Sequence, residues 1–173
     1  GEGGAEGRDE LVVVVICGLN DWKEMFTKFP QGRGPAGFKS NLQRLVVDIK
    51  ELATTLGCSC RIFLPNIPLT ALQSDPAFSL RVWPLGYFAG FLAALWDNQK
   101  VEVAKEDAES RTVYIGSPDL TAPFARPGPG NVSADGVHPS SQGYVWWAQH
   151  IAEQIKRDQG QGTQPDGGGG NVG

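Results

Sequence analysis

The sequence has no uninterrupted run of 18 apolar residues, the length that a membrane-spanning helix needs, and therefore predicts no membrane span. Basic residues are outnumbered: 15 Lys and Arg stand against 19 Asp and Glu, for a net charge of −4. Because phosphate contacts depend on clustered Lys and Arg, this balance argues against a nucleic-acid partner. Three cysteines are too few for a disulfide framework. The 173 residues suit about one domain, and a hydrophobic content of 40% can supply its core.

Methionine is almost missing too, because the only one is Met25 and the chain begins at Gly1. This start predicts a processed product or a fragment, so no targeting signal is inferred from it. Residues 1–10 are rich in glycine and charge, which predicts a flexible head. Residues 158–173 are of low complexity and predict a disordered Gly-rich tail. The folded domain is therefore expected over residues 11–157.

Three short apolar segments predict strands: Leu11–Cys17, Arg61–Leu64 and Thr112–Ile115. The first is a continuous run rich in β-branched residues, without polar alternation. That pattern is typical of a strand buried on both faces of a parallel sheet.

Three segments between and after these strands predict helices: Phe38–Leu56, Leu85–Trp96 with a continuation to about Asp107, and a last one to about Lys156. Ser140 or Ser141 is expected to cap the last helix. The expected buried faces are Leu42, Leu45, Val46, Ile49, Leu52 and Ala53 in the first helix, and Tyr144, Ala148, Ile151, Ala152 and Ile155 in the last.

The resulting order alternates strand and helix three times, which predicts an α/β fold with a parallel sheet. Functional residues of such sheets gather at the carboxyl ends of the strands. Gly18–Asp21 directly follows the first predicted strand, and Asp135–His138 lies in the long loop after the third. These two segments are therefore the candidates for a shared site.

The segment Asp135–Pro139 (Asp-Gly-Val-His-Pro) places an Asp three residues before a His. At that spacing the carboxylate of Asp135 can accept a hydrogen bond from Nδ1 of His138, which leaves Nε2 free to act as a base. The alternative is a turn aspartate beside a surface histidine, because Asp-Gly is also common turn chemistry.

The segment Gly18–Asp21 (Gly-Leu-Asn-Asp) ends a strand with polar residues. Asn20 there can direct its amide NH₂ at an oxyanion. The alternative is a strand-ending turn in which Asn20 caps the backbone.

Together, and in this order, the two segments resemble the SGNH (GDSL-like) hydrolase family. Gly18–Asp21 is similar to the third sequence block of that family, and Asp135–Tyr144 with Trp147 and Ala148 is similar to its closing block. Asp75–Asp97 also resembles a segment of bacterial-type members. The resemblance covers Leu11 to Lys156.

The resemblance implies an ester hydrolase with a flavodoxin-like, three-layer α/β/α fold and no cofactor. His138 would match the general base and acid, Asp135 its orienting partner, and Asn20 the side-chain donor of the oxyanion hole. Gly18 would match the glycine that permits a tight turn, and Asp21 would help to shape the site. Residues 11–157 would then be a partial SGNH hydrolase domain that lacks the first two strands of the family.

One part of the family pattern is absent, because no Gly-Asp-Ser sequence occurs in the chain. The nucleophilic serine is therefore expected upstream of it. Ser117 lacks the flanking glycines of a nucleophile elbow, and Ser140 and Ser141 are more simply explained as helix caps. Cys17 could attack an ester as a thiolate, but a cysteine in a buried strand is more often a core residue.

The remaining polar candidates suggest structural roles. His150 falls off the predicted buried face of the last helix and is expected at the surface. Cys58 and Cys60 are too close for an ordinary disulfide and lack the further ligands of a metal site. Asn131–Ser133 matches a glycosylation acceptor, but a glycan beside Asp135 would disfavour a glycosylating pathway. The sequence thus leaves the compartment open, with the cytoplasm or an organelle favoured.

Two functions follow from the sequence. The first is an SGNH-type esterase or lipase that acts on a small ester. The second is a truncated, inactive relative that serves as a binding or structural subunit. In both, Leu11–Cys17 is expected to become a sheet edge that pairs with the missing N-terminal segment, a second copy or another subunit.

Overall fold

The computed structural model describes residues 9–18, 20–21, 34–72, 75–79, 84–107, 111–118 and 129–161. Within them lies an α/β fold whose three strands form one parallel sheet in the order β1-β2-β3. The predicted fold class is thereby confirmed. In chain order the elements are β1 (Glu10–Val14), α2 (Pro35–Thr55), β2 (Ser59–Pro65), α3 (Leu69–Leu72), α4 (Leu85–Glu106), β3 (Thr112–Ile115) and α5 (Ser141–Gln161).

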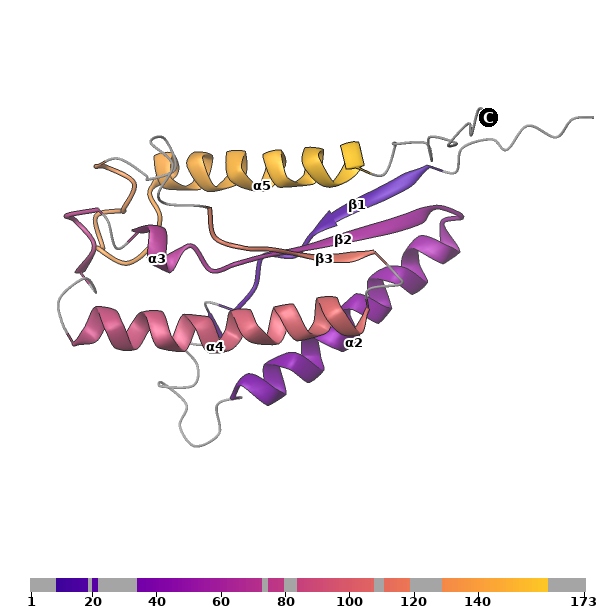
Figure 1. Cartoon of the computed structure of the whole chain (residues 1–173), viewed down its shortest axis with the longest axis horizontal. Coiled ribbons are helices and arrows are strands. Elements are labelled where there is room, and N and C mark those ends of the chain that lie inside the picture. The colour runs from indigo at the N-terminus through magenta and orange to yellow at the C-terminus, as the bar shows by residue number, and fades with distance from the viewer. Residues whose placement is uncertain are drawn as a thin grey trace, which may run out of the picture.

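The sheet lies between two helical layers, with α5 on one face and α2 and α4 on the other (Figure 1). Side chains of β2 alternate between these layers. Ile62 and Leu64 join the core with α2 and α4, whereas Phe63 packs with Trp147 and Ile151 of α5. Ile62, Phe63 and Leu64 are fully buried, as expected in the central strand of a parallel sheet.

The C-terminal helix differs from its prediction in length and in its buried face. It runs to Gln161, so residues 158–161 are helical rather than part of a disordered tail, and residues 162–173 lie outside the described part. Trp147 and Ile151 are buried, whereas Tyr144 is 49% exposed. The buried face of α5 differs from the predicted one because it is centred on Trp147, whose large apolar side chain packs against β2 and β3. The predicted flexible head, residues 1–10, extends one residue too far, since Glu10 already belongs to β1.

Strand β1 lies at the edge of the sheet, where the sequence predicts it for a chain without the first two family strands. The expectation of burial on both faces is wrong, because Val12 and Val14 are each 37% exposed and Ile16 is 64% exposed. Val14 is in register with Phe63, which places it on the α5 face of the sheet. Helix α5 covers β2 and β3 but leaves these β1 side chains open.

Helix α2 is also open on the side away from α4. Its α4-facing flank carries Lys39 and Gln43, which bond to Glu106, and Lys50, which bonds to Asp107. The apolar residues Leu45, Leu52 and Leu56 lie on the opposite flank of the helix and are exposed. Burial of Leu45 and Leu52 was therefore wrongly predicted, because α2 has a helical neighbour on one side alone among the described residues.

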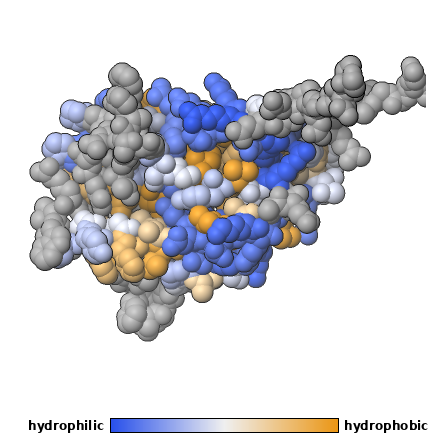
Figure 2. All heavy atoms as spheres, in the orientation of Figure 1, coloured by the Kyte–Doolittle hydropathy of each residue, from blue (hydrophilic) through white to orange (hydrophobic). Residues whose placement is uncertain are grey.

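Apolar surface also gathers on the first half of α4. Phe88 and Phe91 are more than half exposed there. Figure 2 shows this surface as an orange area at the lower left, while α5 and the second half of α4 are mostly hydrophilic.

We expect the chain to self-associate through the outer edge of β1, because no described strand pairs with that edge and its apolar part, Leu11–Val14, has no charge, proline or bulge to oppose strand pairing. Sedimentation velocity should show oligomers for the natural chain and a shift toward monomer for the Val12→Lys/Val14→Lys double variant. Val47→Lys, an exposed valine on α2, is the control. The Val15 N–H donates to Phe63 O, so the N–H groups of Val12 and Val14 face the outer edge. A monomeric natural chain whose Val12 and Val14 amides exchange freely would show that β1 needs no neighbour.

Candidate functional site

The two candidate segments of the sequence meet at the carboxyl end of the sheet. They line one cavity of about 480 Å³, with Asn20 and Asp21 after β1 and His138 in the segment before α5. The segment after β2 contributes a third wall. The described residues that line it are Ile16, Cys17, Gly18, Asn20, Asp21, Ile67, Pro68, Leu69, Leu72, Val137, His138, Pro139, Tyr144 and Trp147. The cavity is thus mostly apolar, with a small polar group formed by Asn20, Asp21 and His138.

Asp135 and His138 are paired as the sequence predicts. Oδ2 of Asp135 lies 2.5 Å from Nδ1 of His138. The other oxygen, Oδ1, accepts hydrogen bonds from the backbone N–H groups of Val137 at 2.9 Å and His138 at 3.0 Å. It also accepts one from the Ser133 hydroxyl at 2.5 Å. The carboxylate therefore orients the imidazole and is itself held by three further donors.

These donors keep Asp135 ionised. The Ser133 hydroxyl, the His138 imidazole and the N–H groups of Val137 and His138 together hold the pKa of Asp135 well below its usual range. An ionised acceptor requires a proton on Nδ1 of His138, so the neutral imidazole presents Nε2 as its free acceptor. The sequence did not identify Ser133 in this role, because its hydroxyl also belongs to a glycosylation acceptor pattern.

The backbone around His138 is closed into a tight loop. Ser133 N donates to His138 O at 2.8 Å, and Ser140 N donates to Asn131 O at 2.8 Å. Val132 and Pro139 form an antiparallel bridge between these two bonds. Ser140 accepts from the N–H of Gly143 at 3.2 Å and so caps α5, which confirms one of the two predicted caps.

Asp75 ties this loop to the rest of the fold. Its carboxylate is 2% exposed and accepts hydrogen bonds from the N–H groups of Ala77 at 2.8 Å and Asn131 at 2.9 Å. Beyond the family resemblance of Asp75–Asp97, no local pattern predicts this role, since the bond to Asn131 spans 56 positions. Asn131 is also 2% exposed, so its side chain is not accessible as a glycan acceptor.

Two glycines permit close approaches that shape the loop. Gly136 has φ +72°, and a Cβ there would lie 1.9 Å from the Ser79 hydroxyl. A Cβ at Gly143 would lie 2.2 Å from the backbone oxygen of Asn131. Larger residues at either position would therefore displace the segment that carries Asp135 and His138.

Gly18 plays a similar part on the other side of the cavity. Its φ of +107° turns the chain sharply after β1, and a Cβ there would lie 3.2 Å from Ile67 Cδ1. Asn20 follows with an exposed side chain, and Asp21 is half-buried. Asn20 and His138 belong to segments far apart in the sequence, yet both face the same cavity.

No serine or threonine is among the described residues that line the cavity, and Cys17 is the one thiol among them. Burial raises the pKa of the Cys17 thiol, an effect that the Lys100 ammonium partly offsets. The thiol form is therefore favoured, which makes Cys17 a poor nucleophile at neutral pH.

The other polar candidates lie outside the cavity lining. Ser117 accepts a hydrogen bond from Nδ2 of Asn66 at 2.7 Å. His150, predicted at the surface, is half-buried, and its Nε2 bonds to the backbone oxygen of Gly116 at 2.9 Å. Cys58 and Cys60 are free thiols.

Among the described residues no group of three His, Cys, Asp or Glu side chains is arranged to hold a metal ion. None of the helices described is both long and apolar enough to cross a membrane.

In comparison with known proteins, no family model, curated protein or solved structure matches the chain.

Proposed function

We propose that the cavity is the base and oxyanion half of an ester-hydrolase active site of the SGNH type. The observation that carries this proposal is the convergence of Asn20 and His138 on one cavity, with Asp135 bonded to the far side of the imidazole. An amide donor and an oriented base are the two groups that acyl transfer needs besides a nucleophile.

In this mechanism, Nε2 of His138 takes the proton from a serine hydroxyl as its oxygen attacks the ester carbonyl. The carbonyl oxygen becomes an oxyanion, and the Asn20 NH₂ donates a hydrogen bond to it. The imidazolium is stabilised by Asp135 and then gives its proton to the departing alcohol. Water, deprotonated by the same imidazole, then attacks the acyl-serine. As the second oxyanion collapses, the imidazolium returns this proton to the departing serine oxygen, which releases the acid and restores the serine and the neutral imidazole.

A serine hydroxyl is the part of this mechanism that the described cavity lining does not supply. We propose that a further segment or subunit brings it to the cavity along β1. Two features of the β1 end favour this route. No strand of the described part pairs with the outer edge of β1, and Ile16, which follows β1 into the cavity wall, is 64% exposed.

The second candidate is a non-catalytic subunit that binds a small apolar ligand or a partner chain. The same lack of a lining serine favours it. The two proposals differ in whether ester turnover by the protein requires His138.

We expect Asn20→Ala to lower kcat for ester hydrolysis by about 10²–10³-fold in the form of the protein that carries the serine, because one oxyanion donor is lost. Stopped-flow assays with p-nitrophenyl acetate and butyrate measure this effect. Asn98→Ala, an exposed asparagine on α4, is the matched control. The 173-residue chain alone should show no turnover.

Two outcomes would overturn parts of this account. A loss of melting cooperativity in Asn20→Ala, with kcat retained, would make Asn20 a structural cap. No turnover in the protein at the full length that its gene encodes would favour the binding subunit.

A further inference from the structure

An ion pair in the core connects the two walls of the cavity that β1 and β2 provide. Asp97 and Lys100 lie one turn apart on α4, and Nζ of Lys100 is 3.0 Å from Oδ1 of Asp97. The Lys100 side chain is 1% exposed and that of Asp97 is 15% exposed. A lysine is almost never buried so fully unless its charge is paired.

The stability of the fold alone does not explain a buried ion pair at this place. Burial raises the pKa of Asp97, and the Lys100 ammonium opposes that rise. Replacing a buried ion pair by apolar residues of similar size is often neutral or stabilising. A role in fixing one arrangement of the chain is therefore the better explanation for two charges at this place.

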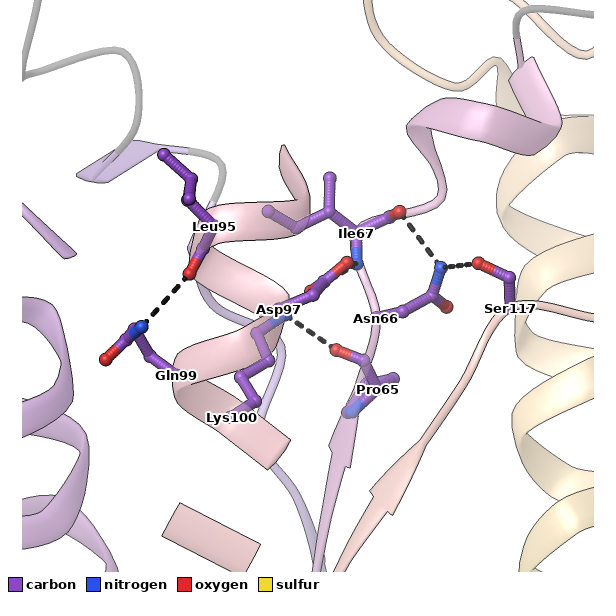
Figure 3. A network of polar contacts seen from close by, with 8 residues as sticks. All are labelled: Pro65, Asn66, Ile67, Leu95, Asp97, Gln99, Lys100 and Ser117. Atoms are coloured by element: carbon purple, nitrogen blue, oxygen red, sulfur yellow. Dashed lines mark hydrogen bonds and ion pairs between the residues drawn. The ribbon is translucent and has the colours of Figure 1, made fainter. Parts of the chain in front are cut away.

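The pair holds the backbone just where β2 ends. Nζ of Lys100 donates to Pro65 O at 2.7 Å, and the carboxylate of Asp97 accepts from the Ile67 N–H at 3.0 and 3.1 Å. Figure 3 shows both side chains reaching from α4 to the backbone on either side of Asn66, whose own side chain points away toward Ser117. The turn that leads into the cavity wall is thus fixed from α4.

The same contacts reach β1 through Gly18. A Cβ at Gly18 would lie 3.2 Å from Ile67 Cδ1 and 3.6 Å from Lys100 Cε. Gly18, in the chain after β1, therefore lies against the side chains of Ile67 and Lys100, both of which the ion pair holds in place. Asn20 follows two residues later and faces the cavity with His138.

We propose that Asp97 and Lys100 are positioning residues for the cavity, which fix Gly18 and Ile67 and through them the place of Asn20 relative to His138. The inference rests on the proposed function for its catalytic meaning. The structural claim itself, that the pair sets the place of Asn20, is tested without substrate.

The test compares the natural chain with the double variant Asp97→Leu/Lys100→Met by amide hydrogen exchange and NMR. Exchange in residues 16–21 is divided by exchange in α5, so that a general loss of stability cancels. We expect this ratio to rise ~10-fold, the effect of losing about one net hydrogen bond. The Asn20 side-chain amide signals should also shift. The matched control is Glu102→Gln/Lys105→Met, a pair on the same helix with the same spacing but with both side chains exposed.

A change confined to the Ile67 amide, with residues 16–21 and the Asn20 amide signals like those of the control, would show that the pair is only structural. Asp97→Asn keeps the size of the side chain and serves in the same comparison if the double variant does not fold. Absence of ester turnover would reject the proposed function but would leave this result unchanged.

Discussion

Asp135→Asn is expected to lower kcat for ester hydrolysis by about 10⁴-fold in the serine-bearing form of the protein, with KM nearly unchanged. An asparagine can present its NH₂ to the imidazole, which favours the tautomer with the proton on Nε2. His138 would then have no free acceptor toward the serine. The variant also lacks the negative charge of Asp135, and that charge stabilises the imidazolium in the transition state.

Steady-state kinetics on p-nitrophenyl esters measure this effect. Asp48→Asn, an exposed aspartate on α2, is the control and should match the natural protein. An unchanged kcat in Asp135→Asn would contradict the role of the short contact between Asp135 and His138.

Asp75→Ala is expected to give the largest loss of stability among the site variants, about 2–4 kcal/mol in the free energy of unfolding. Backbone N–H groups, among them those of Ala77 and Asn131, would lose a charged and buried acceptor. Urea unfolding at pH 7 measures this loss, and exchange in residues 129–140 should rise with it. Asp48→Asn serves again as the exposed control.

The cost should depend on pH in a defined direction. The N–H of Ala77, together with those of Gly130, Asn131 and Val132, holds the pKa of Asp75 below its usual value despite burial. A carboxyl with a lowered folded pKa contributes stability above its unfolded pKa of about 3.9, and this contribution is lost as the pH falls through the folded pKa. The difference between natural protein and Asp75→Ala should therefore be constant from pH 7 to about 5 and shrink below pH 4. A difference that grows on acidification would contradict an ionised Asp75.

Much of the fold follows from local sequence patterns. The strand Thr112–Ile115 was predicted with its observed bounds, because a short β-branched and aromatic run lies between polar segments. The pairing of Asp135 with His138 was also predictable, since three residues of separation bring both side chains into one turn. Local spacing is enough for such features.

Features that depend on distant parts of the chain were not predictable in the same way. The sequence places Lys100 in a polar helix segment, yet the residue is fully buried. It can be buried because its ammonium group donates to Pro65 O and forms an ion pair with Asp97. The role of Asp75 depends on Asn131, far along the chain. Leu45 and Leu52 fit a helical apolar pattern, but that pattern cannot tell which flank of α2 has a neighbour.

The most direct test of the central claim is ester hydrolysis by His138→Ala beside His150→Ala, since these are the only two histidines in the chain. The protein is assayed at the full length that its gene encodes, with p-nitrophenyl butyrate as substrate. His138→Ala should lose nearly all turnover because the base of the cavity is removed, whereas His150→Ala should retain it, since His150 bonds to Gly116 outside the cavity. Turnover that survives in His138→Ala would contradict the proposed active site.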